Sequence, residues 1–319
     1  MMKRRIGVAL CVLGVLLAIF GIVLITVLWP SLARIPADLD QETIQQGPVT
    51  LYDGQHDAYV TYNVTSSRHY VAVKASKEIV YLNETITFTD TATGQEMPSV
   101  RANYHLGIDR VTRENVERRG DGIGGGHYSF PFNVSKNEIY PFWNEGNPEN
   151  IYCKYVDETD LEGLHVYIFE MSTPAKGLAT PAGFLPPDLQ IYPPAMRIDQ
   201  KIRMYVEPVS GVTVYFESTT MRSGQIPMPD PLYPATGPMT FKDVTFYEDN
   251  LTFTQDTIDD LVGQAKSAKT QVTLVKNVLP WLSIGGGIVL VVVGVFLARM
   301  SSKASSPPDT KVTNASPPS

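Results

Sequence analysis

Two long apolar runs, one near each end of the 319-residue chain, constrain its fold more than any other feature. The first, Ile6–Trp29, holds 24 uncharged residues and is followed by Pro30. At about 1.5 Å per residue, such a helix reaches roughly 36 Å, which exceeds the ~30 Å hydrocarbon core of a bilayer. A cleaved signal peptide is the alternative, but its apolar region usually has only about 7–15 residues. The length therefore predicts a transmembrane helix over residues 6–29.

The second run predicts another transmembrane helix over residues 278–298, between Lys276 and Arg299. Pro280 and Trp281 lie at one end of it, where the membrane interface tolerates a kink and favours an aromatic ring. Residues 299–319 are rich in Ser and Pro without an apolar pattern, which predicts a disordered tail.

The positive charges predict how the chain is oriented. Lys3, Arg4 and Arg5 precede the first run, and basic residues predominate in the tail. Residues 31–277 hold 20 Lys and Arg against 32 Asp and Glu, a net charge of −12. The positive-inside rule then predicts a two-pass protein of the cytoplasmic membrane. Residues 1–5 and 299–319 are expected in the cytoplasm, and residues 31–277 form an extracytoplasmic domain.

Small residues recur at heptad-like spacing in both runs. The first run has Gly7, Gly14 and Gly21, and the second has Gly287 and Gly294. Such a stripe lets two helix backbones approach closely, so the two spans are predicted to pack antiparallel through these glycines. The alternative is that glycine is simply common in membrane helices.

Composition excludes several classes of protein. A mean hydropathy of −0.06 excludes a protein with many membrane spans, and 18% charged residues argue against a disordered chain. A net charge of −7 makes nucleic acid an unsuitable partner. Cys11 lies inside the first run and Cys153 outside it, so no intramolecular disulfide is expected.

Short runs rich in Val, Ile, Tyr, Phe and Thr predict strands in the central segment. They lie at residues 59–64, 69–75, 79–90, 100–108 and 164–171, with a hairpin at 202–207 and 212–217 and a final pair at 239–246 and 251–253. Residues 256–276 instead show helical periodicity. The domain is therefore expected to be mainly β (α+β): an antiparallel β-barrel or strongly curved sheet plus one long helix, flanked by two transmembrane helices.

Two proline-rich stretches, residues 174–198 and 227–238, interrupt these strands and carry large apolar side chains. They either cover an edge of the core or form a cavity mouth or partner surface, because apolar loops need cover.

Recognisable catalytic motifs are absent from the sequence: it has no nucleophile elbow, HExxH, CxxC or Walker loop. Residues 122–126, rich in Gly, lack the following helix of a phosphate-binding loop and predict a turn. Asp157, Glu158, Asp160 and Glu162 are interpreted as a solvated acidic turn. No catalytic residue, cofactor or metal ligand is predicted, and the chain is not expected to be an enzyme.

Binding of apolar ligands is the chemistry that remains. A closed or half-closed sheet can enclose an apolar cavity, and six aromatic residues are predicted to line one. They are Tyr128, Phe130, Phe132, Tyr140, Phe142 and Trp143. The alternative is that these rings pack in the core. Asn-x-Ser/Thr sequons predict N-glycosylation at Asn63, Asn83, Asn133 and Asn250, while Asn314 in the cytoplasmic tail should stay unmodified.

A run of motifs resembles the porin PorA-like family, a family of unknown function: DRVT at 109–112, YSFPF at 128–132, then Lys136, Tyr140 and Trp143. Residues 162–169 and the hairpin at 206–211 resemble its later motifs. The sequons and proline-rich insertions depart from the pattern. The resemblance implies an elongated β-barrel with internal cavities between two spans, and lipid binding in envelope glycolipid assembly. It implies no catalytic residue.

The preferred hypothesis is a non-enzymatic membrane protein whose outer β-domain binds or transfers a membrane lipid or glycolipid. A structural or protein-interaction module of the cell surface, with envelope proteins as partners, is the second. A channel is third, because two helices cannot enclose a pore by themselves.

Overall fold

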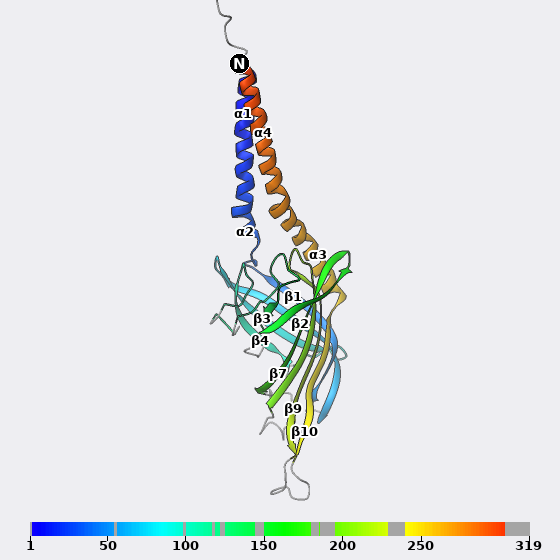
Figure 1. The fold of residues 1–319 in the computed structure, drawn as a ribbon. Coiled ribbons are helices and arrows are strands. Elements are labelled where there is room, and N and C mark those ends of the chain that lie inside the picture. Colours follow the sequence, from blue (N-terminus) through cyan, green and yellow to red (C-terminus); the bar gives the residue numbers. More distant parts are fainter. Residues whose placement is uncertain are drawn as a thin grey trace, which may run out of the picture. The chain divides into compact units, whose positions relative to one another are not determined.

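The structure is a computed structural model that describes residues 2–53, 56–97, 100–116, 119–121, 125–143, 150–179, 185, 195–228 and 240–303 (Figure 1). It divides into two compact units: residues 1–32 with 271–319, and residues 33–270. The described part of the first unit is helical, and the second combines one β-sheet with one helix. The tail beyond residue 303, the proline-rich residues 180–184, 186–194 and 229–239, and the glycines at 122 and 124 lie outside the described residues.

The helical unit contains two apolar helical stretches. The first comprises α1 (Met2–Val23), the π-helical segment η1 (Leu24–Leu28) and α2 (Trp29–Leu32). The second comprises η4 (Thr273–Val278) and α4 (Leu279–Lys303), and it continues directly from α3 (Gln255–Val272). Arg5–Leu32 and Gln255–Met300 are both long and apolar enough to cross a membrane. The prediction of one separate long helix over residues 256–276 is therefore imprecise. Helix α3 does not end before the second apolar run but continues into it through the π-helical segment η4.

Helical backbone continues past Pro30, where the sequence predicts an end, as far as Leu32. Pro30 has no N–H to donate, and it follows directly on η1, in which the Trp29 N–H bonds to the Leu24 carbonyl. A π-helical turn already interrupts the regular α-helical ladder, which eases the loss of one donor. The Lys276 ammonium of η4 lies 5.2 Å from the centre of the Trp29 ring, the first residue of α2, so a cation–π contact joins the two apolar stretches here.

Helices α1 and α4 run antiparallel, and glycines of α1 lie against the backbone of α4. A Cβ atom added at Gly7 would lie 2.6 Å from the Gly294 carbonyl oxygen, and one at Gly14 would collide with the carbonyl oxygen of Gly287. At Gly21 an added Cβ would lie 2.8 Å from the Pro280 carbonyl oxygen. Because these neighbours are backbone atoms that cannot rotate away, the close contact requires glycine at these positions.

The second unit is built on ten antiparallel strands in the spatial order β4-β3-β2-β1-β10-β9-β8-β7-β6-β5 (Figure 1). Their bounds are β1 Asp40–Asp53, β2 Ala58–Ala75, β3 Ile79–Asp90, β4 Ala102–Asp109, β5 Tyr140–Phe142, β6 Ile151–Leu161, β7 Leu164–Ala179, β8 Ala195–Val206, β9 Thr213–Met228 and β10 Thr240–Phe253. Burial alternates along β3, as expected for a strand with one face in a core.

The sheet is not closed, so the barrel alternative is wrong and β4 and β5 are its edges. Strand β5 has only three residues and includes Pro141, which cannot donate to a ladder. Two short segments lie between the edges and form isolated bridges, Ile108 to Asn115, Glu114 to His127 and His127 to Phe142. We call residues 113–116 and 126–128 the seam. The seam pairs with backbone groups of the two edge strands that would otherwise be left without a hydrogen-bond partner.

The sequence-based prediction missed three strands, β1, β5 and β6, and split two others. The predicted strands at 59–64 and 69–75 are the single strand β2. Strands β1 and β6 are rich in Gln, Thr, Asp and Glu, which hides their apolar period. The predicted pair at 239–246 and 251–253 is the single strand β10. Residues 248–250 read as a turn in sequence, yet the buried Asp249 accepts a hydrogen bond from the Thr220 N–H at 3.1 Å. That partner from β9 is remote in sequence, so propensity alone could not reveal it.

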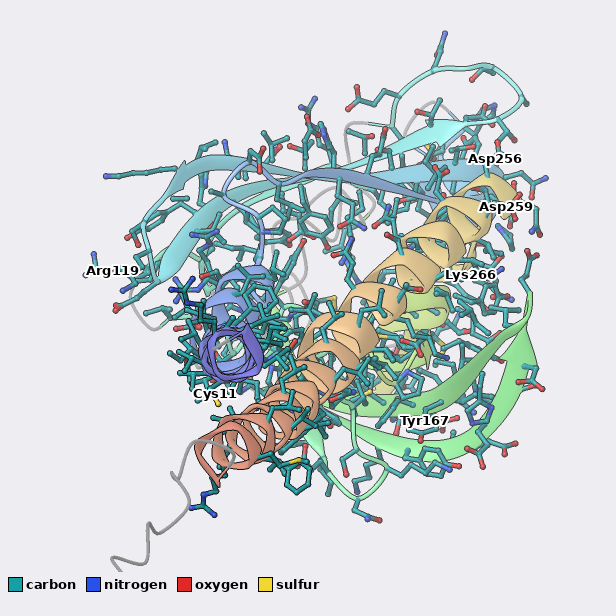
Figure 2. All side chains as sticks on the ribbon, turned by 90° about the horizontal axis from the view of Figure 1, so that it is seen from above. Cys11, Arg119, Tyr167, Asp256, Asp259 and Lys266 are labelled. Carbon is teal, nitrogen blue, oxygen red and sulfur yellow. The ribbon has the colours of Figure 1, made fainter. Side chains whose placement is uncertain are left out.

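Helix α3 packs on the sheet through Ile258, Leu261, Val262 and Ala265, which form one buried cluster with strand residues including Leu164 and Val166. Figure 2 shows the helix crossing the sheet, with Asp256 and Asp259 near its first turn and Lys266 further along. The Lys266 ammonium donates to the Glu162 carbonyl at 2.9 Å, which fastens α3 to the β6–β7 turn. Glycine at 163 (φ 76°) gives this turn its left-handed backbone.

The hairpin between β8 and β9 is also tied to α3. Glu207 is fully buried, and its carboxylate accepts the backbone N–H groups of Val209 and Ser210 at 3.1 and 2.7 Å. The Lys269 ammonium of α3 lies 3.2 Å from the other carboxylate oxygen. A buried carboxylate needs such partners, so this residue of the 206–211 motif has a structural role.

Candidate binding cleft

Three of the six predicted cavity-lining aromatics lie in the core. Phe130, Tyr140 and Phe142 have exposed fractions of 0, 3 and 7% and belong to one buried cluster. The Phe130 ring centre lies 4.8 Å from that of Phe142 and 5.2 Å from that of Tyr140. These distances are typical of packed aromatic pairs, and Phe169 fills the space beside them.

The other three aromatics pack against neighbours at the rim of the core. The Tyr128 ring meets Tyr70 edge-on at 5.0 Å, and the Trp143 ring meets Tyr104 at 5.2 Å. The Arg113 guanidinium lies 4.3 Å above the Phe132 ring. None of the six lines either of the two cavities described below.

The family-like motifs build the seam and its surroundings. The Asp109 carboxylate accepts the Val111 and Thr112 N–H groups at 2.8 Å, which shapes the turn after β4. Arg110 donates from Nε to the Ile35 carbonyl at 2.7 Å and from Nη1 to the Ser76 carbonyl at 2.8 Å. These bonds hold the segment that follows the first apolar helix against the β2–β3 turn.

Arg113 holds the seam to the aromatic core. Its guanidinium donates to the Phe130 carbonyl while stacking on Phe132. Burial lowers the pKa of Arg113 to about 10, so the side chain still carries its charge at neutral pH. The arrangement is structural, because the cation is engaged by a carbonyl and a ring.

Among the described residues, titratable groups at the surface form ion pairs around Glu158. His165 lies 3.1 Å from Glu158 and 3.4 Å from Asp160, and Glu158 also bonds Lys136. Lys136 holds the pKa of the Glu158 carboxyl below its usual range. Within the described part of the chain, no group of three His, Cys, Asp or Glu side chains is placed to hold a metal ion.

Polar side chains are also buried within the sheet, among them Gln45, Ser66, Glu84, Thr220 and Asp249. Arg68 lies 3.4 Å from Glu84, so that carboxylate has a cationic neighbour. Asp249 is only 6% exposed, and burial raises the pKa of its carboxyl to about 6, although Tyr247, Arg222 and Thr220 act in the opposite direction.

Asp249→Asn is expected to stabilise the domain at neutral pH. A carboxyl with a pKa near 6 when folded and 3.8 when unfolded loses stability as pH rises through that range, on the order of 3 kcal/mol. Asparagine removes this loss and keeps an oxygen for the Thr220 N–H. Thermal unfolding followed from about pH 4 to about pH 7.5 should show a gain only at the upper end. The same substitution at exposed Asp243 of β10 is the control; a similar gain there would contradict the assignment.

Two sequons meet at an open polar groove of about 460 Å³. It is lined by Asn63 of β2 and Asn250 of β10, together with Gln46, Thr91 and Thr252. Asn133 is exposed at a turn (φ 59°), and Asn83 is half-buried within β3. Glycosylation at these positions stays a prediction, and a glycan on Asn63 or Asn250 would fill this groove.

A second cavity, which we call the β2–β4 cleft, is smaller and apolar, with a volume of about 220 Å³. Val73, Tyr81, Leu82 and Leu106 supply its apolar walls. Lys74, Asn83, His105, Arg119 and Gly120 complete the lining. Because a glycan on Asn83 would obstruct this cleft, ligand binding here requires Asn83 to be unmodified. Figure 2 labels Arg119 beside the blue and cyan strands to which β2–β4 belong.

The cleft arises from two local irregularities. The β2–β3 register shifts between Ala72 and Lys74, so Val73 is the extra residue of a β-bulge and is 57% exposed. Residues 119–121 lie along β4, where the Asp121 N–H donates to the His105 carbonyl at 2.6 Å. This close approach requires glycine at position 107, because a Cβ there would collide with the Arg119 backbone.

Sequence reasoning missed this cleft, since its walls come from positions as distant as 73 and 119. No motif marks them. The bulge depends on pairing between β2 and β3, and the segment 119–121 depends on contacts with β4. Only those pairings bring one exposed valine and two basic residues together.

Comparison with known proteins adds one decisive observation. The Porin PorA family matches residues 6–296, which is most of the chain. The protein belongs to the Porin PorA family. This confirms the resemblance carried by the 109–112 and 128–132 motifs. No curated protein matches it.

Membership in the PorA family and the two apolar helices identify a membrane protein. In this PorA-family chain the motif residues Asp109, Arg110 and Phe130 have partners within the fold, and the Phe130 carbonyl accepts from Arg113, which directly follows the first motif. Because these residues hold the seam together, they are poorer candidates for contacting a ligand than the residues that line the β2–β4 cleft.

Proposed function

We propose that this PorA-family protein is a non-enzymatic, two-pass protein of the cytoplasmic membrane that binds lipid or glycolipid in its extracytoplasmic domain. The carrying observation is the apolar β2–β4 cleft, open to the surface beside an exposed valine. The charge difference between residues 31–277 and the two flanks supports the orientation, with both termini in the cytoplasm.

The cleft suits part of one alkyl chain. Its volume of about 220 Å³ equals roughly seven water molecules. That is below the roughly 300–1,000 Å³ of pockets that enclose whole ligands, so only a segment of the chain would be buried. Each methylene group removed from water contributes about 0.8 kcal/mol, and covering Val73 adds apolar burial from the protein side.

Photolabelling of the full-length protein in lipid nanodiscs tests this proposal. The probe is a long-chain lipid with a photoreactive diazirine in its alkyl chain, and labelled peptides are mapped by mass spectrometry. We expect labelling within residues 73–83 and 105–106, in addition to the apolar helices. Val73→Trp should fill the cleft and reduce this labelling several-fold, while leaving the helices labelled.

Val111→Trp is the matched control, because Val111 is also an exposed valine, at 50%, and does not line the cleft. Labelling confined to the two apolar helices would contradict lipid binding by the sheet. A stable protein crosslink in cells, without labelled cleft peptides, would instead favour the cell-surface interaction role. Conductance in planar bilayers would favour a channel, which needs several chains because two helices cannot enclose a pore.

A further inference from the structure

We infer that the lipid held in the β2–β4 cleft is a fatty acid whose carboxylate is bound by Lys74 and Arg119. This inference rests on the proposed lipid-binding function and specifies its ligand. It starts from the contrast between the apolar walls of the cleft and the two cations that complete its lining.

Both cations are available to a ligand. Lys74 and Arg119 are exposed, and neither forms an ion pair with another residue in the described ranges. The nearby carboxylate of Asp121 accepts the His105 N–H at 2.6 Å and lies 3.5 Å from the His105 ring. It is therefore directed to β4 rather than to either cation.

The local charge is opposite to that of the surrounding domain. Residues 31–277 carry a net charge of −12, so two basic residues beside one apolar cleft are a local reversal. An anionic head group is attracted to this site and repelled by the acidic surface elsewhere. A neutral lipid has no such preference for the site.

The backbone directs these two side chains to the same cleft. Lys74 follows the β-bulge and is paired with Tyr81. Arg119 precedes Gly120 (φ 117°), whose own Cβ would collide with the His105 carbonyl, so this segment is held against β4. The planar guanidinium offers two parallel donors that match a carboxylate, and the lysine ammonium adds a point charge.

The size of the cleft agrees with a single-chain lipid. About 220 Å³ accommodates a segment of one alkyl chain and not two side by side. A fatty acid places its one charge directly at the end of its one chain. With the chain in the apolar part, the carboxylate then reaches the rim where both cations lie.

Paired photoprobes test the inference in full-length protein in nanodiscs of neutral lipid. One probe is a diazirine fatty acid and the other is the fatty alcohol with the same chain. The carboxylate of the acid would form exposed ion pairs with Lys74 and Arg119, which the alcohol cannot form. The acid is therefore expected to label the cleft peptides about fivefold more than the alcohol at low salt. High salt should reduce this preference through screening.

The double variant Lys74→Gln with Arg119→Gln should abolish the preference and leave alcohol labelling unchanged. Lys77→Gln with Arg101→Gln, two exposed cations that do not line the cleft, is the matched control and should keep it. Equal labelling of unmodified protein by both probes would overturn the fatty-acid inference while the proposed function stands. If neither probe labels the cleft peptides, both fail.

Discussion

Replacing Phe130 by alanine is expected to destabilise the outer domain by about 3–5 kcal/mol. The ring is fully buried and packs against Tyr140, Phe142 and Phe169 with centre distances of 4.8–5.2 Å. Its removal leaves a void in the aromatic cluster that it forms with these residues. In a domain of this size the loss corresponds to a fall of roughly 10 °C in the thermal unfolding midpoint. Near-ultraviolet circular dichroism of the full chain in detergent can follow it.

Phe241→Ala is the matched control, because Phe241 is 62% exposed on β10. Its effect is expected to stay within about 0.5 kcal/mol. An unchanged midpoint for Phe130→Ala would mean that the ring does not support the core, and the earlier interpretation of a cavity-lining residue would then be preferred.

Gly14→Leu is expected to separate α1 from α4. The added side chain would have to occupy the position of the Gly287 backbone, which cannot move aside as a side chain can. Overpacking typically costs about 1–3 kcal/mol, and contact with backbone places this substitution at the severe end. The native Cys11 reports the separation, because its sulfur lies 3.6 Å from the Val291 carbonyl oxygen of α4. Val291→Cys adds no bulk at the glycine contact and should form an intramolecular disulfide with Cys11 on oxidation, and Gly14→Leu should abolish most of it.

Ala9→Leu places the same side chain on the exposed side of α1 and should leave this disulfide intact. Cys153 does not compete for the oxidant, because it is fully buried and burial raises the pKa of its thiol to about 12. Crosslinks found only between separate chains would contradict packing of the two helices within one chain.

The candidate site was less predictable than the fold. Clustering of Tyr128 to Trp143 in the sequence gave a reason to expect a lined cavity, but clustering cannot distinguish a cavity wall from a core. The decision depends on whether Phe169 and Met204, from strands remote in sequence, fill the same space, as they do. The β2–β4 cleft shows the reverse case, since its lysine and arginine have no sequence feature that separates them from other surface cations.

Local interactions explain what the sequence alone determined. The two apolar helices follow from the length and hydropathy of the apolar runs, and α3 follows from the helical period of its apolar residues. Each of these features can be read from residues that are close together in the sequence. The strand at 79–90 was equally clear, because its apolar side chains alternate. Tertiary structure alone decided that residues 240–253 form one strand, that the sheet stays open at a short β5, and that a bulge at Val73 opens a cleft. Those outcomes depend on hydrogen bonds and packing with distant partners, whose free energies no local pattern encodes.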